Sequence, residues 1–331
     1  MALRARGINY DTGFYPGGHG SRERFDPDTV RHEMHVIAHD LHCTAVRVSG
    51  GDPERLSVAA ELAVAEDLEV WFAPFPCEMT VEQLRPFFAE CADRAEAVRV
   101  RSNAPVVLVL GCELSLFGAG FLPGETVFER IEEMLAAAPT GLHTVNAALN
   151  TFLGDVVADA RTRFGGRITY ASGTWEFIDW APFDIVAVDA YRDRTNASSY
   201  AADLRRRIKQ QDLPFVVTEF GCCTYAGAGD RGGIGWDIVD DSATPARLTG
   251  DFVRDEAGQA TYLTECLRTF DEVGVDSAFW FTFASYGLPH RDDPRLDLDM
   301  AAYGVVKMLD ETAWEPKDSF RALAEAYRSE R

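Results

Sequence analysis

Two glutamates stand directly after apolar runs that are typical of buried strands. Glu113 ends the segment VVLVLGCE, and Glu219 lies in PFVVTEF. A carboxylate at the end of a buried strand is costly to desolvate, so such a residue usually has a chemical role. Two carboxylates that meet at one site are the minimum equipment for acid/base and nucleophilic cleavage of a glycosidic bond.

Strand-like and helix-like segments alternate along the chain, which is the pattern of parallel strands joined by helices. Most expected strands are short continuous apolar runs, as in sheets that are covered on both faces. The eight are Ala5–Tyr10, Ala45–Ser49, Glu69–Phe75, Val106–Leu110, Arg167–Ser172, Asp184–Tyr191, Phe215–Phe220 and Ser277–Phe283. The expected helices include Pro27–Leu41, Pro53–Glu66, Thr80–Arg101, Thr126–Ala138, Tyr200–Gln210 and Glu256–Val273. For the fifth strand, the segment HTVNAAL within 141–164 is an alternative.

These units predict an α/β fold, a single-domain (β/α)8 or TIM barrel over residues 1–331. Glu113 and Glu219 then end the fourth and seventh strands, which face each other across the rim where barrel enzymes place active sites. A doubly wound sheet is the alternative, but NYDTGFYPGGHGSRERF after the first strand does not fit a G-x-G-x-x-G phosphate loop. Loop 221–255, after the seventh strand, is the longest and should form part of the pocket or its lid.

Composition and charge narrow the class of protein. Hydrophobic residues make up 47% of the 331 residues, which is enough for a large core. The net charge of −21 repels phosphate backbones and anionic lipids, so we expect a small-molecule substrate, with neither nucleic acid nor a membrane as partner. The first residues, MALRARGINYD, lack the apolar core of a secretion signal, which predicts a cytoplasmic protein.

The seven cysteines show no CxxC pair and no framework spacing, so we interpret them as reduced thiols. Neither a metal site nor a cofactor is expected from them. Cys222 and Cys223 follow Glu219 closely in the sequence. A nucleophilic role for either thiol would require a nearby histidine to lower its pKa.

The residues around the two glutamates resemble a known clan. Besides Glu113 and Glu219, they are Arg47 in AVRVSG, Tyr191 in VDAYRD and Trp280 in AFWFTF. This set resembles the retaining glycoside hydrolases built on α/β barrels, over most of the chain but only at the strand ends. The resemblance implies that Glu113 is the acid/base and Glu219 the nucleophile. It also implies that Tyr191 hydrogen-bonds the nucleophile, Arg47 keeps it ionised and Trp280 stacks on a sugar ring.

The implied roles agree with simple electrostatics. Burial and neighbouring negative charge should raise the pKa of Glu113 and keep its proton available, while Arg47 holds Glu219 as an anion. Carboxyl groups about 5 to 5.5 Å apart would give retention of stereochemistry. One position departs from the clan's pattern: Cys112 stands where an asparagine donates to the sugar 2-hydroxyl. A thiol is a weaker donor, so the substrate either lacks that hydroxyl or is not a sugar.

A second resemblance leaves other functions open. The segments GINYDTGF, DLHCTAVRVSGGDPERL and TEFGCCTYAGAGDRGG resemble actinobacterial proteins labelled abortive-infection proteins, a label that implies no defined chemistry. The glutamate pair could instead carry out a cyclisation or rearrangement of a secondary metabolite. The chain could also be a non-catalytic ligand-binding or phage-defence protein, with both glutamates held in arginine salt bridges.

Four more residues are expected at the same rim because they lie at predicted strand ends. They are Asn9, Tyr10, Trp175 and Asp189. Asp189 lies two residues before Tyr191, so the two side chains should share one face of their strand. Asp189 would then be a third acid at the mouth of the barrel.

A stripe of histidines is the last pattern. His32, His35, His39 and His42 follow one another at helical spacing and share one face, which resembles a chelating surface. The apolar residues of the same helix fall on the opposite face, which should pack against the barrel. The histidines are therefore expected to face solvent, far from the catalytic rim, and to bind metal only adventitiously.

Overall fold

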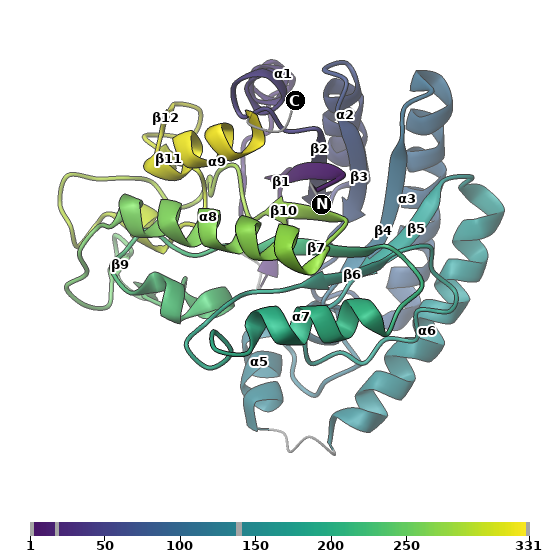
Figure 1. Cartoon of the computed structure of the whole chain (residues 1–331). Coiled ribbons are helices and arrows are strands. Elements are labelled where there is room, and N and C mark those ends of the chain that lie inside the picture. Colours follow the sequence, from purple (N-terminus) through teal and green to yellow (C-terminus); the bar gives the residue numbers. More distant parts are fainter. Residues whose placement is uncertain (1–2, 17–19, 137–140, 329–331) are drawn as a thin grey trace.

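Eight parallel strands form one sheet that closes into a barrel, with helices around it (Figure 1). The computed structural model describes residues 3–16, 20–136 and 141–328. In the order of their hydrogen bonding the strands are β5 (Arg167–Ala171), β4 (Val106–Cys112), β3 (Glu69–Pro74), β2 (Ala45–Gly50), β1 (Ala5–Asp11), β10 (Ser277–Trp280), β7 (Phe215–Phe220) and β6 (Val186–Asp189). A parallel bridge between Ser172 and Val188 joins the two edges. The predicted (β/α)8 barrel is confirmed.

All eight expected strands are present, and the differences lie at their ends. The fifth strand begins at Arg167, and the alternative in HTVNAAL is wrong because that segment lies in helix α6 (Leu142–Arg163). The eighth barrel strand is β10 because a small hairpin precedes it in the chain. In this hairpin β8 (Val239–Asp240) pairs with β9 (Arg247–Leu248). A second hairpin, of β11 (Val306–Met308) and β12 (Trp314–Pro316), follows the barrel.

The helices cover the outside of the barrel (Figure 1). They are α1 (Pro27–His35) with its π-helical continuation η2 (Val36–Asp40), α2 (Pro53–Val64), α3 (Val81–Ser102), α4 (Leu114–Phe117), α5 (Val127–Ala136), α6, α7 (Tyr200–Lys209), α8 (Glu256–Val273) and α9 (Asp318–Arg328). The six expected helices are confirmed, although residues 137–138 of the fourth lie outside the described residues. Helices α4, α6 and α9 were not among the expected ones. None of the described helices combines the length and apolar character needed to cross a bilayer.

Local sequence explains where two of the helices, α2 and α8, begin. Asp52 accepts hydrogen bonds from the backbone N–H groups of Glu54 and Arg55, and Pro53 fits the first helical turn of α2. Asp255 caps α8 in the same way through Gly258. Each of these acidic caps satisfies N–H groups that have no partner within the helix, so both helices start at a defined residue.

The barrel interior is filled by side chains. Trp71 on β3 and Phe279 on β10 are fully buried there, with ring centroids 4.8 Å apart. Gly7 on β1 provides the space for this packing, because an added Cβ would lie 2.2 Å from the ring of Phe279. A filled interior leaves the ends of the strands as the place where polar side chains can meet a ligand.

Loop 221–255 is anchored to the C-terminal part of the chain by a buried ionic network. Lys317 is fully buried and contacts Asp299 Oδ2 at 2.9 Å and Thr224 Oγ1 at 2.9 Å. Arg254, at the end of the loop, reaches the same oxygen of Asp299 at 2.8 Å. Both ends of the loop are therefore tied to the segment between β10 and α9.

We expect Lys317→Met to lower the free energy of unfolding by about 3 kcal/mol, because it leaves the carboxylate of Asp299 buried with one cation fewer. Urea unfolding followed by circular dichroism measures the change. Arg321→Met is the control, since Arg321 forms an exposed ion pair with Asp318 on α9 and should leave stability within experimental error. Equal losses in the two variants would contradict the role given to Lys317.

Candidate active site

Each carboxylate oxygen of Glu219, on β7, accepts a hydrogen bond from an N–H or O–H donor. Arg47 Nη1 donates to Oε1 at 2.5 Å, and the hydroxyl of Tyr191 donates to Oε2 at 2.8 Å. The carboxylate is buried, with 7% of the residue exposed. Two hydrogen bonds, one of them from a guanidinium, fix its orientation.

Arg47 is positioned by Asn9, its neighbour across the β1–β2 ladder. Arg47 Nη1 also donates to Asn9 Oδ1 at 2.8 Å, and Asn9 Nδ2 donates to the backbone carbonyl of Thr218 at 2.9 Å. The asparagine therefore links β1, β2 and β7 around the arginine. Both residues are buried, so Asn9 orients the guanidinium and does not face a ligand directly.

Tyr191 follows β6 and lies against the glycines of loop 221–255. A Cβ added at Gly233 would be 3.2 Å from the tyrosine ring, so η4 (Gly232–Ile234) can pass close to it. The ring of Tyr303 lies 6.0 Å away on another side. Burial and the charge of Glu219 raise the pKa of Tyr191, so the phenol keeps its proton and remains a hydrogen-bond donor.

Glu113 is presented by an irregular turn at the end of β4. The β4–β5 register shifts between Val109 and Cys112, Gly111 has φ +91°, and Glu113 itself has φ +44°. Such a bulge re-aims a side chain at the end of a strand. Gly111 is needed there, because a Cβ would meet the side chain of Leu114 at 2.9 Å in a left-handed conformation.

The carboxyl of Glu113 lies in an environment that favours its neutral form. Burial and the charges of Asp189 and Glu219 raise its pKa well above the usual range. The residue as a whole is nevertheless partly exposed. Glu113 and Glu219 thus differ in their surroundings as an acid and a carboxylate nucleophile should.

Cys112 and Asp189 lie beside the pair. The thiol of Cys112 donates to Asp189 Oδ2 at 3.3 Å and to Glu219 Oε1 at 3.6 Å. One oxygen from each carboxylate and the sulfur lie within 4.8 Å of one another, as metal ligands would. Arg47 already pairs with Glu219 at this place, and its positive charge disfavours a metal ion there. Burial and the charge of Glu219 raise the pKa of Asp189.

Glu176 is a buried carboxylate that sequence reasoning missed. It accepts hydrogen bonds from the backbone N–H and the hydroxyl of Ser115, at 3.0 and 2.6 Å, and from the hydroxyl of Tyr170 at 2.8 Å. Ser115 in turn accepts a hydrogen bond from Trp175 Nε1 at 3.0 Å. This network holds the turn that carries Glu113. The sequence signal for Glu176 is the same as for Glu113 and Glu219, an acidic residue that follows an apolar strand.

Two expected residues lie elsewhere. Trp280 is fully buried between strand and helix, where its indole N–H donates to the carbonyl of Tyr303 at 3.1 Å, so it offers no ring face to a sugar. Tyr10 points to the helical layer and hydrogen-bonds Glu33. Successive strand side chains point to opposite faces, so Tyr10 turns outward where Asn9 turns inward. Phe281, next to Trp280, is partly exposed.

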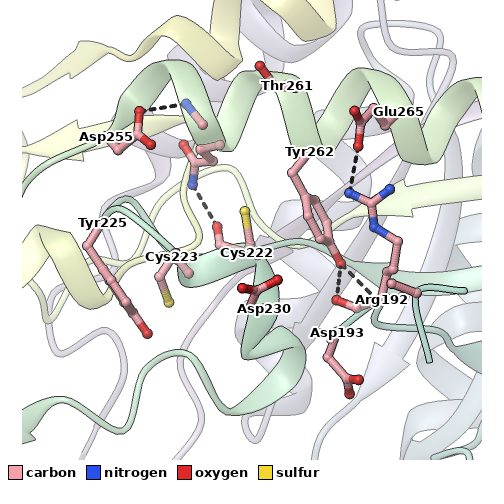
Figure 2. A pocket seen from close by; sticks show the side chains of 16 residues that line it. Arg192, Asp193, Cys222, Cys223, Tyr225, Asp230, Asp255, Thr261, Tyr262 and Glu265 are labelled. Atoms are coloured by element: carbon pink, nitrogen blue, oxygen red, sulfur yellow. Dashed lines mark hydrogen bonds and ion pairs between the residues drawn. The ribbon is translucent and has the colours of Figure 1, made fainter. Parts of the chain in front are cut away.

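A cavity of about 450 Å³ (Figure 2) has neither Glu113 nor Glu219 among its lining residues. It is lined in part by Arg192, Glu265 and Tyr262, and by Cys222 and Cys223. Burial raises the pKa of both thiols. Neither cysteine therefore has the thiolate character of a nucleophile, and neither contacts Glu219 in the part of the chain that the structure describes.

Several glycoside hydrolases of known structure share this architecture. A GH113 β-1,4-mannanase aligns over 99% of this chain and 100% of its own, with a TM-score of 0.65 and 14% sequence identity. A GH113 β-mannanase from Alicyclobacillus acidocaldarius, in complex with ManMIm, aligns over 99% of this chain and 98% of its own, with a TM-score of 0.64 and 15% identity. The chain has the fold of these enzymes.

A β-glucuronidase from Parabacteroides merdae also matches 99% of this chain, which corresponds to 36% of the glucuronidase, with a TM-score of 0.59 and 12% identity. No protein-family model matches the chain, and no curated protein sequence does. At such identities the similarity establishes the fold alone. The chemistry has to be argued from the side chains at the strand ends.

We expect Asp189→Asn to stabilise the protein increasingly as the pH rises above about 4. The raised pKa means that folded Asp189 keeps a proton that the unfolded chain releases. Wild-type stability therefore falls as the pH rises from the unfolded pKa through the folded pKa. Asparagine does not titrate, so the free energy of unfolding of the variant relative to wild type should increase steadily with pH, as measured by urea unfolding at a series of pH values.

Asp203→Asn on α7 is a control with the opposite sign. Hydrogen bonds from Ser199 and Arg206 lower the pKa of the partly exposed Asp203. Its contribution to stability is present above the unfolded pKa and lost as the pH falls through the folded pKa. The asparagine variant should therefore lose stability relative to wild type as the pH rises. Parallel pH curves for wild type and Asp189→Asn would show that Asp189 titrates normally.

Proposed function

We propose that this chain is a glycoside hydrolase-like enzyme that acts on a glycoside or a glycosylated small molecule. In this proposal Glu113 is the acid/base and Glu219 the nucleophile. The observation that carries it is the contrast between the two carboxyls. Glu219 has both oxygens held by Arg47 and Tyr191, whereas burial and the charges of Asp189 and Glu219 raise the pKa of Glu113.

The reaction follows from these roles. A carboxylate oxygen of Glu219 attacks the anomeric carbon, and the bond to the leaving oxygen breaks while Glu113 donates its proton to that oxygen. Glu113 is then a carboxylate and takes a proton from water. The resulting hydroxide attacks the anomeric carbon and releases Glu219. Two displacements at one carbon retain the configuration of the sugar.

Arg47 and Tyr191 act on the charge of the nucleophile. Both donate to Glu219 in its ionised form, and both bonds weaken when the ester forms and the negative charge is lost. They therefore favour the departure of Glu219 in the second step. Asn9 holds Arg47 in place, and its role is positioning.

Cys112 bears on the choice of substrate. Its thiol is directed to Asp189 and Glu219, so it is not free to act as a donor to a sugar 2-hydroxyl. This supports a substrate for which that contact is unimportant. It is also the one observation that favours a second candidate, non-hydrolytic acid/base chemistry by the same two glutamates on a secondary metabolite. The net charge of −21 supports a small-molecule ligand in either case.

Trapping the nucleophile tests the proposal. Because the similar structures include mannanases and a glucuronidase, activated 2-deoxy-2-fluoro β-mannosides and β-glucuronides are the first reagents, followed by gluco and galacto isomers. The fluorine slows hydrolysis of the ester, so mass spectrometry should find one sugar attached to Glu219. Glu219→Gln should abolish labelling, and Glu325→Gln, an exposed glutamate on α9, should not. Labelling at another residue would contradict the assignment.

Leaving-group dependence tests the acid. We expect Glu113→Ala to lower kcat/KM by about 100-fold or more on a glycoside with a poor leaving group, because that oxygen needs a proton. A dinitrophenyl glycoside needs none, so its first step should be little affected. Added azide should restore turnover and give a glycosyl azide of retained configuration. An equal loss on both substrates would exclude Glu113 as the acid.

A further inference from the structure

Three potential metal ligands converge on the outer surface of the barrel, away from the glutamate pair. His35 Nδ1 lies 3.2 Å and His39 Nε2 lies 2.8 Å from the same oxygen of Glu66, Oε2. The two imidazole rings have centroids 4.4 Å apart. One ligand atom from each residue lies within 4.8 Å of the other two. The three side chains thus already point at a common place.

The backbone explains this convergence. His35 ends α1 and His39 lies four residues later in η2, so both side chains emerge on one face. Val36 and Ile37 between them are buried and hold the opposite face of the helix against the barrel. Glu66 follows α2, which packs beside α1 (Figure 1). The site is therefore built from two neighbouring helical segments with fixed backbones.

We propose that His35, His39 and Glu66 form a binding site for one divalent transition-metal ion, with Zn²⁺ as its representative. Two imidazole nitrogens and one carboxylate oxygen form a ligand set known for zinc. The histidine side chains are 58% and 55% exposed, which leaves room for water at the remaining coordination positions. The ligand atoms need to separate only slightly to admit an ion at bonds of about 2.0 to 2.2 Å.

Two of the four histidines of the stripe, His35 and His39, belong to this site, and His32 and His42 do not. The ring of His32 stacks on Trp314, with centroids 6.1 Å apart and an angle of 18° between the rings. His42 lies beyond η2 with φ +56°, and its Nε2 accepts a hydrogen bond from Arg328 at 3.0 Å. These two histidines are engaged elsewhere. They provide matched controls from the same stretch of chain.

The position of the site indicates what the ion would do. His39 shortly precedes β2, and Glu66 shortly precedes β3, so the site lies at the end of the barrel opposite the catalytic rim. Residues at that end contribute to stability rather than to catalysis. A bound ion would link the end of α1–η2 to the turn after α2. This inference is independent of the proposed enzymatic activity.

Titration of the untagged, chelator-treated protein with ZnCl2 tests the proposal. Calorimetry should show saturable binding of one ion per chain, and thermal melting should show a higher Tm with zinc than without it. His39→Gln and Glu66→Gln should each weaken binding by at least about tenfold and remove the shift in Tm. His32→Gln and His42→Gln should bind zinc as wild type does. Both key substitutions are at or near the surface, and circular dichroism without metal verifies their folding.

Co²⁺ distinguishes this site from the cysteine-containing group at the barrel mouth. Bound by His35, His39 and Glu66, cobalt should give only weak visible absorption, whereas ligation by Cys112 would add an intense thiolate band in the near ultraviolet. The proposal is overturned if no saturable binding occurs, if a thiolate band appears, or if His39→Gln and Glu66→Gln bind as tightly as wild type.

Discussion

A guanidinium and a carboxylate, Arg47 and Glu219, are paired in the mouth of the barrel where almost no water reaches them. A buried carboxylate is costly unless a cation and further hydrogen bonds compensate it. Here the compensation comes from the first, second and sixth strands, because Asn9 orients the arginine and Tyr191 completes the contacts of the carboxylate. The closed barrel is what brings these strands to one place.

The same pair determines the behaviour of its neighbours. One arginine faces three carboxyls, from Glu219, Asp189 and Glu113, so the charge of the group is not balanced. Glu219 is in direct contact with the cation, and the other two retain protons more strongly than usual. Acid/base catalysis with two carboxyls requires that neighbouring carboxyls differ in their affinity for a proton. The asymmetry therefore follows from which carboxyl reaches Arg47.

Sequence reasoning was most reliable where periodicity carried the information. Apolar runs gave the eight strands, and the polar residue that follows each run indicated the rim. It failed where the direction of a single side chain mattered. Tyr10 and Trp280 end or adjoin strands but point into the helical layer, because neighbouring residues alternate between faces. Glu176 carried the same signal as Glu113 and was overlooked.

The sequence alone determined the number of strands and their order along the chain, because strands that are buried on both faces consist of continuous runs of apolar residues. It also determined which residue types stand at the strand ends. The resemblance implied that Arg47 acts on Glu219, but only the tertiary structure decided how Asn9 orients Arg47, that Cys112 turns to Asp189, and that Glu66 joins two histidines of the stripe. The contacts of Arg47 and Cys112 join strands far apart in the chain, and they depend on the closure of the barrel and on the bulge at Gly111. The contacts of Glu66 depend on the packing of α1 beside α2. No local pattern specifies these arrangements.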